Sequence, residues 1–108
     1  MATLEGVNKK YFRISTQSWR LLADFIFDRC SDLIKDDERH GWHENYGKII
    51  SAETASAIAD RLEVLIDQGV VEGYQIELSI VNMESYFSED ILRKFIEFCR
   101  HSGGFDIW

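Results

Sequence analysis

The chain has 108 residues, 45% of them hydrophobic, and its 19 acidic and 12 basic side chains give a formal charge of −7. This length fits one domain, and the hydrophobic share is too high for intrinsic disorder. No window approaches the roughly 20 apolar residues of a membrane span. The acidic balance argues against nucleic acid or an anionic membrane as the main partner.

The expected compartment is the cytoplasm. The first residues, from Met1 to Gly6, lack the charged and then apolar segments of a secretory signal. Cys30 and Cys99 occupy apolar positions of helical patterns, outside any C-x-x-C motif, and we expect two buried thiols. Seven Phe, four Tyr and three Trp residues supply a core. We therefore expect neither a cofactor nor a stabilising metal.

The first predicted helix runs from about Thr16 to Ile34. Its apolar residues recur with the i, i+3, i+4, i+7 spacing of one helical face. Ser15 or Thr16 can be the N-cap, because a side-chain oxygen there accepts from a free amide of the first turn. The apolar face consists of Trp19, Leu22, Ala23, Ile26, Cys30, Leu33 and Ile34.

Two further helices have clear start and stop signals, and glycine provides the stops, since the chain has no proline. Ser51 is a suitable N-cap for the second helix, and Gly69 suits the position just beyond its end, where a positive φ is common. The third helix begins at Ser88 and stops before Gly103. The apolar residues of 105–108 are expected to pack back onto the core.

The segment Val70–Phe87 is ambiguous. Its apolar residues fit a helix, but alternate residues from Tyr74 to Ile80 also fit a strand. A strand would need a partner, for which Lys10–Ile14 and Gly104–Trp108 are candidates. We favour a helix. The predicted fold is therefore mainly α, a small single-domain bundle of three to four helices over residues 1–108, with at most a minor two-stranded element.

The loop of residues 36–47 mixes polar and aromatic side chains. His40 and His43 can place two imidazoles near one metal ion, but the H-E-x-x-H spacing and a nearby Cys are missing. The alternatives are a capped loop whose Trp42 and Tyr46 pack over the helix ends, and a partner-binding loop. We expect the packed loop rather than a metal site.

The sequence does not predict an enzyme. It contains no G-x-S-x-G, P-loop or G-x-G-x-x-G motif. Cys99 and His101 are two residues apart on a predicted helix, so their side chains diverge.

The negative charge is concentrated in one segment. Residues 1–50 carry eight basic and eight acidic side chains, whereas residues 51–92 carry one basic and nine acidic ones. Solubility alone requires polar residues on the free face of a helix, but not one sign of charge. A field of one sign speeds encounter with a basic partner. The candidate partner-binding residues are Glu53, Asp60, Glu63, Asp67, Glu72, Trp42 and Tyr46.

Three segments together resemble a loosely defined group of small bacterial proteins without an established function. They are Tyr11-Phe-Arg leading to Trp19-Arg-Leu-Leu, Gly41 with Asn45-Tyr-Gly47, and Ser102-Gly-Gly-Phe with Ile107. Some members carry a cysteine-rich insert before the last helix, which this chain lacks. The resemblance implies a small helical fold and a joint role for Trp19, Arg20, Asn45 and Gly47. One hypothesis is that Arg20 and Asn45 hold the 41–47 loop against the first helix.

Three functions compete. The first, which we favour, is an immunity- or antitoxin-like inhibitor that meets a basic partner protein through residues 51–92. The second is a metal-binding or small enzymatic domain that uses the loop of His40 and His43. The third is a structural or oligomerisation module, for example a homodimer, with an apolar patch formed by Phe25, Phe27, Trp42 or Trp108.

Overall fold

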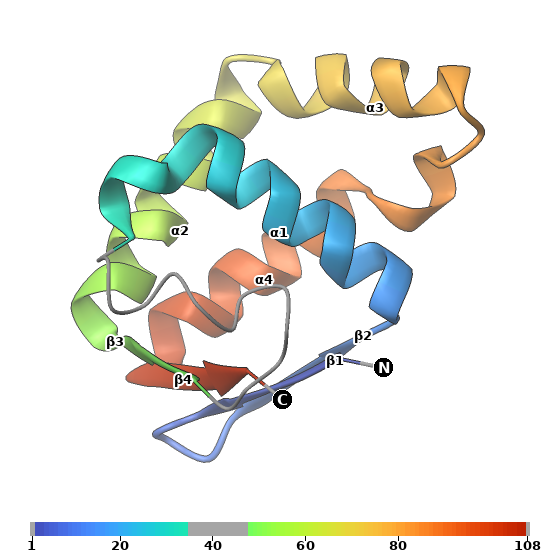
Figure 1. Cartoon of the computed structure of the whole chain (residues 1–108). Helices are drawn as coiled ribbons and strands as arrows, with labels where there is room; N and C mark the ends of the chain where they lie inside the picture. The colour runs from blue at the N-terminus through green and yellow to red at the C-terminus, as the bar shows by residue number, and fades with distance from the viewer. Residues whose placement is uncertain (1, 35–47, 108) are drawn as a thin grey trace.

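The computed structural model of the chain describes residues 2–34 and 48–107, which form four α-helices and one antiparallel sheet (Figure 1). The helices are α1 (Thr16–Cys30), α2 (Ala52–Asp67), α3 (Val70–Ile80) and α4 (Glu89–His101). The strands are β1 (Ala2–Gly6), β2 (Tyr11–Ile14), β3 (Lys48–Ser51) and β4 (Gly104–Ile107). Short 3-10 helices occupy Ser31–Leu33 and Glu84–Tyr86.

The mainly helical character is confirmed, but the expectation of a minor two-stranded element is wrong. The sheet has four strands in the order β2-β1-β4-β3. The C-terminal strand lies inside this sheet, pairing Ile107 with Leu4 of β1 on one side and Phe105 with Ile50 of β3 on the other. The two segments considered as partners for a strand in 70–87 are indeed strands. They pair within this sheet instead, β2 with β1 and β4 with both of its neighbours.

The helices lie on one face of the sheet (Figure 1). In β1, Ala2 and Leu4 point toward them and are buried, whereas Thr3 and Glu5 alternate onto the other face. Phe105 of β4 is fully buried and meets Phe95 and Phe98 of α4, with ring centroids 6.1 and 5.4 Å apart. This aromatic contact joins the sheet to the helical layer.

The predicted helix starts are confirmed in detail. Ser15, Ser51 and Ser88 are the N-caps of α1, α2 and α4, and each side chain accepts from the amide three residues later. Gly69 follows α2 with a φ of 77°, the left-handed conformation predicted for it. The first helix ends at Cys30, earlier than predicted, because the chain tightens into a 3-10 turn at Ser31–Leu33.

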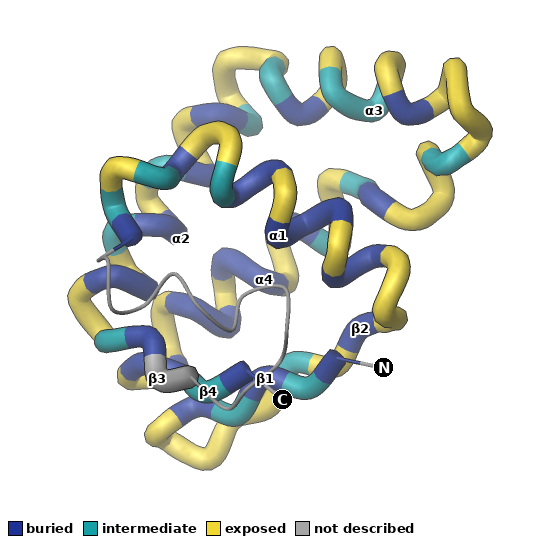
Figure 2. The backbone as a smooth tube through the Cα atoms, in the orientation of Figure 1, coloured by how far each residue is buried: buried dark blue, intermediate teal, exposed yellow. Residues whose placement is uncertain are grey.

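The helical interpretation of residues 70–87 is confirmed for Val70–Ile80, which form α3. This helix lies farthest from the sheet, and its outward side is exposed (Figure 2). Val71 and Leu78 are its buried residues. Tyr74 adds a half-buried ring that contacts Phe25 of α1 and Phe87, at centroid distances of 5.1 and 4.9 Å. One side of α3 thus attaches it to the rest of the molecule.

Replacing Gly73 by alanine should stabilise the protein. Gly73 lies inside α3 with an ordinary negative φ, and an added Cβ would meet nothing within 4 Å. Alanine restricts the unfolded chain and favours a helix, so the free energy of unfolding should rise by about 0.5–1 kcal/mol. Chemical denaturation measures this change.

The matched control is Gly104→Ala. Gly104 has a φ of 99°, and a Cβ there would lie 2.7 Å from the Ile50 carbonyl oxygen. This variant should be clearly destabilised. A Gly73→Ala protein that loses stability as Gly104→Ala does would contradict the open environment of residue 73.

Candidate functional site

Two of the predicted partner-binding carboxylates are paired within the molecule. Arg100, near the end of α4, donates from Nη2 to Asp60 Oδ1 at 3.0 Å and from Nη1 to Glu63 Oε1 at 2.6 Å. The sequence could not show this contact, because 37 and 40 residues separate the partners. Arg100 therefore reduces the negative potential of the α2 surface on which Asp60 and Glu63 lie.

Arg61, the single basic residue of segment 51–92, is also paired within the molecule. Its guanidinium donates two hydrogen bonds to the Asp32 carboxylate, at 3.0 and 2.9 Å, and a third to the Arg29 carbonyl oxygen at 3.0 Å. This bidentate pair ties α2 to the end of α1. It also lowers the pKa of Asp32. Arg61 thus offsets the charge of Asp32, in the 3-10 turn after α1, rather than a charge of its own segment.

The charge that is not offset gathers beyond the end of α2. Glu89 and Asp90 form ion pairs with Arg93 and Lys94 on their own helix. Four other acidic residues form no ion pair within the part of the chain that the structure describes. No lysine or arginine occurs anywhere between residues 62 and 92. The four residues are Asp67, Glu72, Glu77 and Glu84.

Acidic side chains from α1 lie near α3 as well, although Asp28 forms an ion pair with Arg29 at 3.1 Å. Burial raises the pKa of the Tyr74 phenol, and the negative charges of Asp24, Glu77 and Asp28 raise it further. A tyrosine responds to these charges only if they lie close to its hydroxyl group. Carboxylates of both α1 and α3 therefore contribute to the negative potential at Tyr74.

The outer face of α3 is apolar at its centre and acidic at its borders. Ile76 is 62% exposed and Ile80 is 79% exposed. At about 100° per residue, both point away from the buried Val71 and Leu78. Glu72 lies one turn before Ile76, and Glu77 lies in the row beside the two isoleucines.

Sequence reasoning predicted Glu72 but missed Ile76, Ile80 and the exposed Val81. The pattern of residues 70–81 is apolar on two opposite sides of the helix, which explains why it is also compatible with a strand. The ambiguity between helix and strand was itself a sign that some of these apolar residues would be exposed. A helix with apolar residues on both sides has one face in excess of what its fold buries.

The remaining predicted residues separate into two groups. Trp19 is buried in the core, with its ring 6.2 Å from Phe95, and Arg20 is exposed on α1. Glu53 lies exposed in the first turn of α2. The others, and with them the hypothesis that joins Arg20 to the 41–47 loop, lie outside the described residues: His40, Trp42, His43, Asn45, Tyr46 and Gly47.

Of the four residues proposed for the apolar patch of an oligomerisation module, the two that the structure describes do not form an exposed patch. Phe25 is buried, because it packs against Tyr74 and Phe87, and Phe27 is half-buried against the core. Trp42 and Trp108 lie outside the described residues. The exposed apolar residues of α3 occupy a different place.

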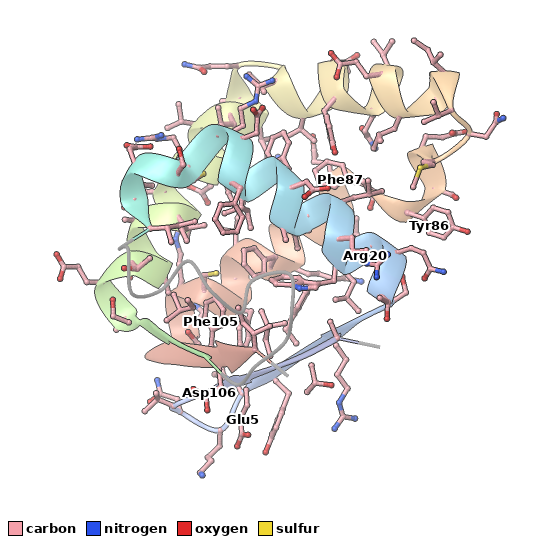
Figure 3. All side chains as sticks on the ribbon, viewed as in Figure 1. Glu5, Arg20, Tyr86, Phe87, Phe105 and Asp106 are labelled. Carbon is pink, nitrogen blue, oxygen red and sulfur yellow. The ribbon has the colours of Figure 1, made fainter. Side chains whose placement is uncertain are left out.

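The remaining groups that could react or bind a metal are the two cysteines and the carboxylates and histidines of the described residues. Cys30 and Cys99 are free and buried, as predicted, and burial raises the pKa of Cys30 to about 11. Among residues 2–34 and 48–107, no three His, Cys, Asp or Glu side chains are grouped to hold a metal ion. Glu5 and Asp106, directly opposite each other on β1 and β4, point away from the helices on the outer face of the sheet (Figure 3).

Comparison with known proteins does not place the chain. No family model matches it, and neither does any curated protein or solved structure. None of the helices that the structure describes has the length and apolar character needed to cross a membrane.

Replacing Arg100 by glutamine should raise the pKa of Glu63. The hydrogen bond from Arg100 is the largest cause of its lowered value. Because the folded-state pKa lies below the unfolded one, the pair stabilises the protein above the unfolded pKa. This contribution disappears as the pH falls through the folded pKa. Arg100→Gln should therefore flatten the loss of stability in acid.

NMR titration of the side-chain carboxyl carbons checks this result. Lys94→Gln removes one positive charge from the same helix but not the partner of Glu63, whose pKa it should leave low. An unchanged Glu63 pKa in Arg100→Gln would show that the pair does not persist in solution.

Proposed function

We propose that this chain is a small cytoplasmic protein-binding domain, of the kind that neutralises a basic partner as immunity proteins and antitoxins do. The proposal is carried by the excess negative charge at one end of the molecule. Asp67, Glu72, Glu77 and Glu84 lie on or beside α3, in a segment without lysine or arginine.

A surface of this kind affects the rate of association more than the final affinity. Clustered charge attracts an oppositely charged protein during diffusion and can raise the association rate constant by 10-fold or more, about 10–10³-fold in favourable cases. Salt screens the effect, since the Debye length falls from about 30 Å at 0.01 M to about 8 Å at 0.15 M. A basic partner is therefore expected to bind in a strongly salt-dependent way.

A structural or oligomerisation role is the second candidate, and the exposure of Ile76 and Ile80 favours it. Association of two copies through α3 would, however, bring Glu72 and Glu77 of one copy near those of the other. Like charges across an interface oppose association. The metal-binding or enzymatic alternative depends on His40 and His43, outside the described residues, and stays a prediction from the sequence.

The test begins with isolation of the partner from the native host, followed by measurement of its association rate with the purified chain. The rate constant should fall steeply between about 0.01 and 0.5 M salt. Asp67→Asn/Glu72→Gln should lower it severalfold at low salt, because both carboxylates belong to the excess charge.

The control variant is Glu5→Gln/Asp106→Asn, which makes the same change in net charge on the outer face of the sheet (Figure 3). Its association rate should stay close to that of the parent protein. Salt-independent association, or equal slowing in the two variants, would refute steering by the acidic region.

A further inference from the structure

We propose that the outer face of α3 docks an amphipathic helix of the partner, one that carries lysine or arginine beside its apolar residues. This face consists of Gly73, Ile76 and Ile80, bordered by Glu72 and Glu77. The inference rests on the proposed function and narrows it to one face and one kind of partner segment.

The fold does not account for the two isoleucines. Val71 and Leu78 hold α3 from the opposite side, and Gln75 adds a hydrogen bond from Nε2 to the Phe87 carbonyl oxygen at 3.0 Å. Ile76 and Ile80 remain mostly in water, at 62% and 79% exposed. The exposed part of their apolar area contributes nothing to the stability of the monomer, and burial against a partner would make it favourable.

Gly73 is also unexplained by the fold. It has no positive φ, and nothing lies within 4 Å of the position that a Cβ would occupy. Glycine inside a helix weakens it, but its missing side chain lets another backbone approach closely. Gly73 precedes Ile76 by one turn, on the same side of α3. The position of Gly73, which has no side chain, thus lies directly beside the apolar ridge of Ile76 and Ile80.

The shape of this face suits a helix. Residues four apart form ridges along a helix surface, and ridges of one helix pack into the grooves of another. Ile76 and Ile80 form such a ridge, and the neighbouring row, from Gly73 to Glu77, begins with a residue that has no side chain. A side chain of a partner helix can enter the groove at Gly73 while its neighbours contact the isoleucines.

The charges decide between the possible occupants. Glu72 lies one turn before Ile76 at the end of the apolar ridge, Glu77 lies in the row beside it, and no basic residue of segment 62–92 balances them. A second copy of α3 presents the same carboxylates and would be repelled. A helix with lysine or arginine flanking its apolar stripe instead places opposite charges near both carboxylates.

The experiment uses a synthetic helical peptide of leucine and lysine, with its leucines on one face, as the probe. A matched peptide has glutamate at every lysine position. Fluorescence anisotropy with the full chain should show saturable binding of the lysine peptide and none of the glutamate peptide. Ile76→Gln/Ile80→Gln should weaken binding by about tenfold or more. Glutamine keeps the helix propensity high, so this variant should fold.

Two further variants distinguish binding at the outer face of α3 from nonspecific binding to exposed apolar side chains. Val7→Gln removes an equally exposed apolar side chain, 64% exposed, from the β1–β2 turn and should leave the affinity unchanged. Gly73→Gln should keep or raise the melting temperature, since glutamine favours a helix, yet weaken peptide binding severalfold by filling the groove.

Three results would overturn the inference. They are unchanged peptide affinity in Ile76→Gln/Ile80→Gln, equal binding of the glutamate peptide, and a dimer in sedimentation that Ile76→Gln/Ile80→Gln abolishes. The first leaves the proposed function standing if Asp67→Asn/Glu72→Gln still slows association with the native partner. Failure of that charge variant as well would reject both.

Discussion

The position of β4 between β1 and β3 is the constraint on which the rest of the fold depends. The last described strand, β4, pairs with the first, β1, and also with β3, so it lies inside the sheet and joins its two halves. Gly104 makes this possible, since its φ of 99° disfavours other residues and an added Cβ would lie only 2.7 Å from the Ile50 carbonyl oxygen. Phe105 then connects the sheet to α4 through Phe95 and Phe98. Among the described strands, β3 pairs with β4 alone, and β1, which also pairs with β2, obtains its second neighbour from β4.

In this arrangement α3 differs from the other three helices in how it contacts the rest of the molecule. The sheet and the helices α1, α2 and α4 supply most of the core, to which α3 adds Val71 and Leu78, and α4 lies against both α2 and the sheet (Figure 1). Arg100 and Arg61 use their charges to join helices, so the acidic residues that they contact are occupied. The helix α3 is attached along one side, through Val71, Tyr74 and Leu78. On its other side, the mostly exposed Ile76 and Ile80 lie beside the carboxylates of Glu72 and Glu77.

The helices could be predicted because their signals are local. Apolar spacing and the caps at Ser15, Ser51 and Ser88 lie within a few residues of what they determine. Most of the sheet could not be predicted, since strands of four or five residues depend on partners far along the chain, as Leu4 does on Ile107. The pairing of β1 with β2 is local, as between Glu5 and Tyr11, and was missed because both strands are too short for a clear alternation. The candidate site was predicted only in part. The sequence located the charge in residues 51–92, but the pairing of Asp60 and Glu63 with Arg100 is long-range. That pairing leaves α3 as the more negative surface.

The central claim is that α3 presents a face reserved for a partner. Amide hydrogen exchange on the chain, free and bound to its native partner, tests this claim most directly, because exchange reports the stability of each segment separately. The account predicts that binding slows exchange most strongly in residues 70–81, with little change in β1 and β4. Protection concentrated on the outer face of the sheet or in the first turn of α2, with α3 unchanged, would contradict it.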